Sequence, residues 1–348
     1  MTATERAKIL LAQNGIFVAL LLLIVFFSTL NPRFFSFSNG ETVLLQIVEL
    51  GIIALPIAFI VMTGSVDLSV GSIASLTAVI SGMVMNETGS PVVGIVAGLA
   101  VGLLTGAING FLVAYFGLSS MVVTLGALSV WGGLALVITN GATVTGLPES
   151  FRALGKAMVG PVPLQLLLLV LAIATAGYLL ARHPIGRQVL AVGGNPRASH
   201  LIGINVPRVR MLLFIASGAS ASVAGILLSA KIQAASPTIG SGLEIQALTV
   251  VLLGGVAFSG GVGRISSVVA GLLFVGVLRN GLIILGVSPF LQTALIGATL
   301  IAGVAMDSSV QRLVNESWAK RGKQAMQATS PVDDSHTPSD EFAQSSAR

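Results

Sequence analysis

The 348-residue sequence has no cysteine and very little charge: 18 Lys and Arg and 13 Asp and Glu residues make up 9% of the chain. Without cysteine, the chain forms no disulfide, offers no thiolate to a metal and has no thiol nucleophile. A soluble domain usually has about a quarter charged residues, so this chain cannot cover a surface that faces water. The hydrophobic fraction of 54% also excludes a disordered chain.

The few charged residues are separated by long runs without any Asp, Glu, Lys or Arg. They include residues 9–32, 50–66, 88–148 and 280–306. About 20 apolar residues in a helix cross a hydrocarbon core of ~30 Å. The runs are longer than the strands of a membrane β-barrel and do not alternate apolar with polar residues. Helices are therefore the structure that hydrogen-bonds the backbone N–H and C=O groups of these runs in lipid. The sequence therefore predicts an all-α, polytopic inner-membrane protein.

Glycine, proline, asparagine and charged residues divide these runs into about ten predicted membrane helices. We expect them near residues 12–30, 43–63, 69–86, 92–115, 120–139, 163–181, 211–230, 246–261, 266–285 and 290–306. Short or broken helices are expected near 65–86 and 246–265, and the loop 140–162 is a further candidate for irregular structure. Residues 1–306 would form the membrane domain. The cytoplasmic tail 307–348 is predicted to be largely disordered after residue 326.

Lysine and arginine predict the orientation, because they collect in the cytoplasmic segments of membrane proteins. With the N-terminus inside, the inner segments hold twelve of these residues up to Lys323, against four in the outer segments. The bias predicts that both ends of the chain are cytoplasmic. It also makes residues 182–210 the longest inner loop.

A polar segment interrupts the apolar pattern between the second and third predicted helices, and it contains Gly64, Asp67, Ser69 and Gly71. A charge that faces lipid is costly, so Asp67 should be buried or paired. It could coordinate a ligand or an ion at an unwound segment. The alternative, which we favour, is that Asp67 is the N-cap of the helix 69–86.

A glycine-rich segment lies in the second half of the eighth predicted helix and contains Gly254, Gly255, Gly260 and Gly261. It is not a phosphate-binding loop, because the second glycine of its GxxxxG pattern is followed by Gly261 and Val262 where that loop requires Lys and then Ser or Thr. Close helix packing or a re-entrant turn is the better interpretation. Residues 64–66 and 260–262 are weakly similar, which suggests an internal repeat at an offset of 196 residues.

The inner loop 182–210 contains a short predicted helix. Asn195 can cap it, Pro196 suits its first position, and Gly203 ends it about two turns later. A capped helix outside the membrane suggests a docking element for another protein. Arg197 can bond to a partner, and Leu201 and Ile202 offer it an apolar contact. The alternative is a basic loop that only sets the orientation.

Other features predict packing and passage rather than catalysis. Glycines recur at a spacing of four over residues 98–110, and Ser217, Ala221 and Gly225 repeat the pattern, which favours close helix contact. The sequence contains no metal-binding pattern or catalytic triad. Four uncharged polar residues within the predicted apolar helices are candidates to line a transport pathway or, equally, to bridge helices: they are Asn109, Thr124, Asn280 and Gln292.

Residues 61–72, with the sequence VMTGSVDLSVGS, resemble the TGGIDLSVGS segment of bacterial ABC-type importer permeases for monosaccharides. That family serves ribose, xylose, arabinose, galactose and the autoinducer-2 signal. Residues 191–204 resemble its cytoplasmic coupling loop, and residues 252–263 with 276–282 resemble its C-terminal half. The resemblance covers residues 40–306. One departure is Ser65, where the family more often has glycine.

The resemblance implies a permease subunit that forms the membrane pathway and binds no cofactor itself, while a partner subunit uses ATP. Two permeases, identical or homologous, would pair with cytoplasmic ATPase subunits in the bacterial cytoplasmic membrane. An extracytoplasmic sugar-binding protein would deliver the ligand, and no nucleic acid is involved. Two alternatives remain open: a branched-chain amino-acid permease, and an ion-coupled carrier that uses Asp67, Glu49 and Glu244.

Overall fold

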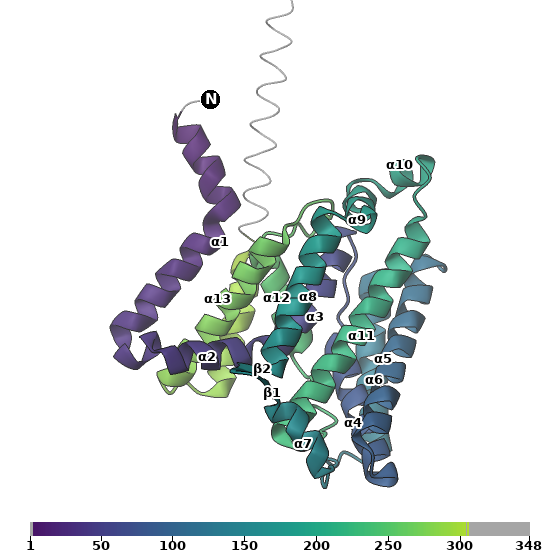
Figure 1. The fold of residues 1–348 in the computed structure, drawn as a ribbon. Helices are drawn as coiled ribbons and strands as arrows, with labels where there is room; N and C mark the ends of the chain where they lie inside the picture. The colour runs from purple at the N-terminus through teal and green to yellow at the C-terminus, as the bar shows by residue number, and fades with distance from the viewer. Residues whose placement is uncertain (1–2, 304, 306–348) are drawn as a thin grey trace, which may run out of the picture. The chain divides into compact units, whose positions relative to one another are not determined.

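The computed structural model describes residues 3–303 and 305, with side chains from Gly15 onward. The chain is helical, with one antiparallel hairpin of strands β1 (Met158–Val159) and β2 (Val162–Pro163). The tail predicted at 307–348 lies outside the described residues. The helices, labelled in Figure 1, are α1 (Ala3–Leu30), η1 (Pro32–Phe35), α2 (Phe37–Gln46), α3 (Val48–Met62), α4 (Val70–Thr88), α5 (Pro91–Ala114), α6 (Ser120–Thr139), α7 (Glu149–Lys156), α8 (Leu164–Ala181), α9 (Pro184–Gly194), α10 (Pro196–Leu201), α11 (Val206–Ile232), α12 (Leu243–Leu253) and α13 (Ile265–Ile284).

Six of the described helices are long and apolar enough to cross a membrane: α4, α5, α6, α8, α11 and α13. The pair α2 and α3, bent by 48° at one residue, makes a seventh if the two helices are counted as one span. Three shorter apolar helices, Gly15–Leu30, α12 and Pro289–Gly303, lie at the other predicted positions. The all-α, polytopic membrane fold is therefore confirmed, and the total of ten spans stays a prediction.

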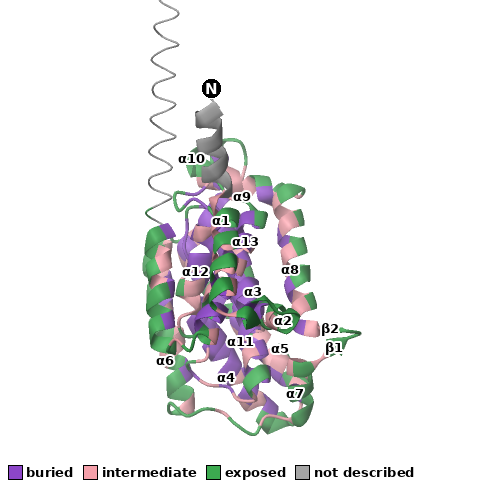
Figure 2. Cartoon of the chain, turned by 90° about the vertical axis from the view of Figure 1, so that its left-hand side faces the viewer, coloured by how far each residue is buried: buried purple, intermediate pink, exposed green. Residues whose placement is uncertain are grey.

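The core is built around α3, whose residues are buried almost throughout. It packs against α8, α11, α12 and α13, while α11 also packs along α4 and α5. Figure 2 shows this buried interior in purple, with the more exposed helices α6 and α8 at its sides. Small residues allow the close contact: a Cβ on Gly106 would lie 2.5 Å from the carbonyl oxygen of Phe214.

The structure corrects several predicted boundaries. Residues 43–63 form two helices rather than one, and the predicted span 246–261 stops at Leu253. The chain turns there because Gly255, Gly260 and Gly261 adopt positive φ angles, which other residues rarely do. The inner loop 182–210 contains α9 as well as α10, and α11 begins at Val206, earlier than predicted.

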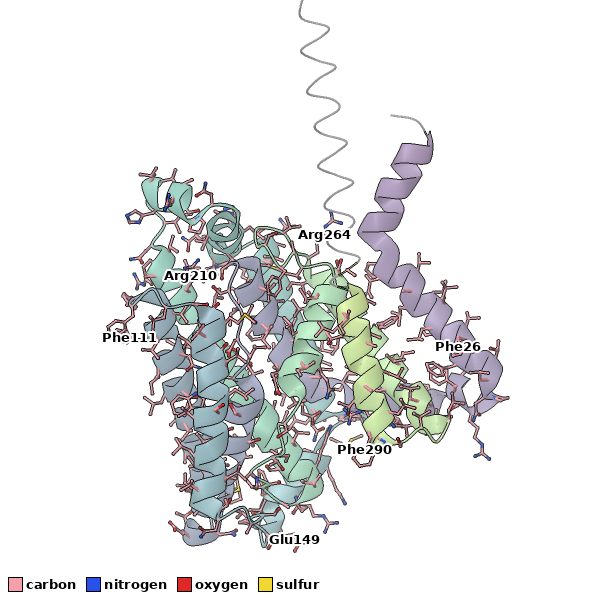
Figure 3. The ribbon with its side chains drawn as sticks, turned by 180° about the vertical axis from the view of Figure 1, so that it is seen from behind. Phe26, Phe111, Glu149, Arg210, Arg264 and Phe290 are labelled. Carbon is pink, nitrogen blue, oxygen red and sulfur yellow. The ribbon has the colours of Figure 1, made fainter. Side chains whose placement is uncertain are left out.

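The two ends of the helical bundle differ in what they carry. Helices α9 and α10 lie at one end and α7 lies toward the other, while the β-hairpin lies between α2 and α7 (Figure 1). In Figure 3, Arg210 and Arg264 lie toward the end with α9 and α10, and Glu149 lies at the opposite end. The basic residues predicted to be cytoplasmic on 182–210 and at 264 thus share one end.

Candidate translocation and coupling sites

Asp67 lies in a non-helical stretch between α3 and α4 and is only 1% exposed. Its Oδ1 accepts hydrogen bonds from the amide (2.9 Å) and the hydroxyl (2.6 Å) of Ser69. Its Oδ2 accepts a bond of 2.7 Å from the Ser217 hydroxyl on α11. Asn109 of α5 donates to the same Ser69 hydroxyl at 2.8 Å. This cluster ties the start of α4 to α5 and α11.

The prediction that Asp67 is the N-cap of the following helix is wrong. The N-cap position belongs to Ser69, α4 begins at Val70, and no side-chain cap bond is formed. Asp67 lies two residues earlier and uses its oxygens on Ser69 and across the bundle on Ser217. The carboxylate therefore connects the break before α4 to α11 instead of capping α4.

Three backbone segments meet at what we call the glycine junction: residues 62–64 after α3, 193–194 at the end of α9, and 260–261 after α12. The Gly261 amide donates to the carbonyl of Met62 at 2.8 Å. A Cβ on Gly193 would clash with that same carbonyl oxygen and with the Gly261 amide. A Cβ on Gly260 would lie 2.8 Å from the Gly64 amide. The predicted repeat thus places its two breaks against each other, with the end of α9 between them.

The predicted docking helix is present as α10. The Asn195 side chain caps it by accepting from the Ala198 amide at 3.0 Å, and Gly203 follows it with a φ of +87°. Leu201 and Ile202 are 86% and 75% exposed. Sequence reasoning missed α9, although His183 and Pro184 are a cap and first-position pair: His183 Nδ1 accepts from the Ile185 amide at 3.3 Å.

The four predicted pathway residues are buried but do not converge. Asn109 and Thr124 lie near the break before α4, where Asn109 bonds to Ser69 and Thr124 donates to the Ser120 carbonyl. Asn280 is on α13, and Gln292 donates to the Val287 carbonyl at 2.8 Å. The helix-bridging alternative therefore describes Asn109, and a pathway role for the four stays a prediction.

The other buried acidic residue on a membrane helix has its own partner. Glu49 on α3 is 4% exposed and forms an ion pair of 2.6 Å with Lys231. The Lys231 ammonium also donates to the Leu45 carbonyl at 2.8 Å. An ion pair between α3 and α11 accounts for Glu49 without a coupling ion.

Comparison with known proteins agrees with this architecture. Residues 39–304 match the family described as "Branched-chain amino acid transport system / permease component". The chain is 37% identical to the ribose import permease protein RbsC of Bacillus subtilis over 87% of its length and 96% of that protein's. It is 36% identical to the L-arabinose permease AraH of Escherichia coli (86% and 92% covered) and 33% identical to the D-allose permease AlsC (86% and 93%). No solved structure matches it. The chain belongs to this family of ABC transport permease components.

Proposed function

We propose that this chain is the membrane-spanning subunit of an ABC importer for a monosaccharide or a related polyol, in the cytoplasmic membrane of a bacterium. The alignments with relatives named for ribose, L-arabinose and D-allose include 86–87% of this chain and 92–96% of each relative. The permease provides the pathway by alternating access. Separate ATPase subunits hydrolyse ATP, an external binding protein delivers the sugar, and a second permease copy or homologue completes the complex.

Helix α10 is the element that we assign to ATPase docking. It presents two large aliphatic side chains, Leu201 and Ile202, to the outside of the bundle, beside the basic Arg197. Exposed aliphatic pairs of this kind favour burial against a partner. This exposure is the observation that carries the coupling assignment, since a permease without a nucleotide site must be moved through contact.

The end of the bundle that carries α10 also indicates how the permease is oriented in the membrane. Helices α9 and α10 share that end with Arg210 and Arg264 (Figures 1 and 3). Basic loops favour the cytoplasmic side, so we place this end inside and the end with α7 toward the binding protein.

The two alternatives have weaker support. The family description names branched-chain amino acids, but the relatives that cover this chain are named for sugars. An ion-coupled carrier needs free coupling carboxylates. Of the three carboxylates considered, Asp67 accepts three hydrogen bonds and Glu49 is in an ion pair, while Glu244 keeps one oxygen without a hydrogen-bond partner among the described residues.

The docking assignment is tested with Leu201→Asp and Arg197→Glu. We expect each variant to insert in the membrane normally while the ATPase subunit no longer co-purifies with it. The matched control is Arg152→Glu, an exposed charge reversal on α7, which should keep the ATPase bound. Normal assembly and uptake by both α10 variants would show that the ATPase docks elsewhere.

A further inference from the structure

The segment after α11 runs back into the bundle. The Cβ of Ala235 lies close to Gly82 of α4, and Gly240 lies against Gly71, eleven residues earlier in the same helix. At 1.5 Å per residue, this segment travels about 16 Å along α4 before α12 begins. The backbone contact requires glycine, because a Cβ on Gly71 would clash with the Gly240 carbonyl and with Glu244. Non-helical backbone at such depth occurs where it is buried in protein or lines a cavity.

A cavity of about 240 Å³ lies where this re-entrant segment meets α4 and α6. We call it the hydroxyl cavity, because five hydroxyl side chains and one carboxylate line it: Ser72, Ser75, Ser129, Thr238, Ser241 and Glu244. A second cavity, of about 420 Å³ between α3, α8 and α11, is lined almost entirely by aliphatic side chains. Of these two cavities, the hydroxyl cavity therefore has the more polar lining.

The exposed position of three of these hydroxyls indicates what the cavity faces. Ser129, Thr238 and Ser241 are exposed on the described chain. The Thr238 hydroxyl pairs with that of Ser236 at 3.2 Å. Hydroxyls without partners are costly in hydrocarbon, so we infer from Ser129 and Ser241 that this surface opens to water rather than to lipid. Discontinuous helices that meet at such a cavity are a common way to build a transport site.

Glu244 determines which ligand chemistry suits the cavity. Its Oε1 accepts from the Gly242 amide at 3.1 Å, at the start of α12. Its Oε2 is buried and has no hydrogen-bond partner within residues 15–303. No Lys or Arg lines the cavity. The carboxylate of an amino acid would find no cationic partner among the lining residues, whereas a sugar brings hydroxyl donors for the carboxylate acceptor of Glu244.

We propose that the hydroxyl cavity holds the transported ligand during passage, that this ligand is a neutral polyhydroxyl molecule of monosaccharide size, and that Glu244 accepts hydrogen bonds from its hydroxyl groups. The cavity volume of about 240 Å³ lies below the roughly 300–1,000 Å³ typical of pockets for drug-sized ligands, which suits a smaller ligand such as a single sugar ring. This inference rests on the proposed function and names the site within it. Gly71 serves the site by leaving room for the Glu244 carboxylate.

The absence of native cysteine makes a direct test possible, because single cysteines can be introduced without removing others. Ser129→Cys and Thr238→Cys place thiols in the cavity, and Ser119→Cys places one on an exposed residue outside it. The complete importer is reconstituted, and D-ribose, L-arabinose and D-allose are first tested for uptake. A hydrophilic thiol reagent then labels each variant with and without the sugar that is transported.

We expect the sugar to slow labelling at both cavity positions, by about threefold at twice its dissociation constant, and to leave Ser119→Cys unchanged. Glu244→Gln should reduce uptake about tenfold, the equivalent of one lost charge-assisted hydrogen bond, with the ATPase still bound. Uptake without protection at either cavity thiol would overturn the cavity assignment alone. No uptake of any of the three sugars by the unmodified importer would overturn the proposed function and, with it, this inference.

Discussion

At the residue scale, Asp67 shows how this chain accommodates a carboxylate inside a membrane bundle. The sequence indicated that Asp67 should be buried or paired, because it lies between two apolar helices. The sequence could not indicate Ser217 as a partner, which is 150 residues away along the chain. Capping is a local pattern, whereas the bond to Ser217 depends on how α11 packs beside the break.

Asp67 variants test this bonding pattern. Asp67→Asn should keep most of the stability, because its amide oxygen can accept from Ser69 and its amide nitrogen can donate to the Ser217 oxygen. Asp67→Ala removes every acceptor and leaves buried hydroxyls unpaired, at a cost of about 1–3 kcal/mol. Thermal unfolding of the purified permease measures the difference. Equal destabilisation by asparagine and alanine would mean that the charge itself is required.

The glycine junction supplies a second residue-scale prediction with a built-in control. Gly193→Ala should prevent coupled transport, because its Cβ would clash with the Met62 carbonyl and push α9 away from both breaks. Gly194→Ala should be tolerated, since nothing lies within 4 Å of its Cβ position. Sugar-stimulated ATP hydrolysis of the reconstituted complex is the measurement. Equal activity of the two variants would show that the glycine junction does not transmit movement from α9 to the two breaks.

At the element scale, the spacing of small residues predicted faces that allow close helix contact, without indicating which helices pair. The glycines at 98–110 do face α11 and α4, since a repeat of four places residues on one helix face. The sequence did not reveal α9 as a separate helix or the re-entrant course of residues 235–242. Their signals are weak because α9 is short and the re-entrant segment depends on a contact between Gly71 and Gly240.

The contact between α5 and α11 gives the element-scale prediction. A Cβ on Gly218 would clash with the carbonyl of Gly102 and lie 2.9 Å from the Cα of Gly106. Gly218→Ala should therefore destabilise the permease by about 1–3 kcal/mol through overpacking. Gly177→Ala on α8, where nothing lies within 4 Å, should not destabilise it. A Gly218→Ala protein with the unfolding temperature of the unmodified chain would contradict the packing.

At the scale of the whole molecule, composition and charge-free runs were enough to predict the membrane class and the approximate positions of the long apolar helices, but not the short helix α9. The sequence motifs also indicated the importer family, which the match over residues 39–304 confirms. The candidate pathway was harder to predict. Asn109 and Thr124 were chosen as isolated polar residues, but the hydroxyl cavity joins α4, α6 and a re-entrant segment that are far apart in sequence.

The central claim is that a partner ATPase drives this permease to import a sugar. Proteoliposomes containing the permease and its ATPase, supplied with the external binding protein, test it by uptake of radiolabelled ribose, arabinose or allose. The account predicts uptake that requires both ATP and the binding protein and that persists when proton and sodium gradients are abolished. Uptake by the permease alone, driven by an ion gradient without ATP, would contradict it.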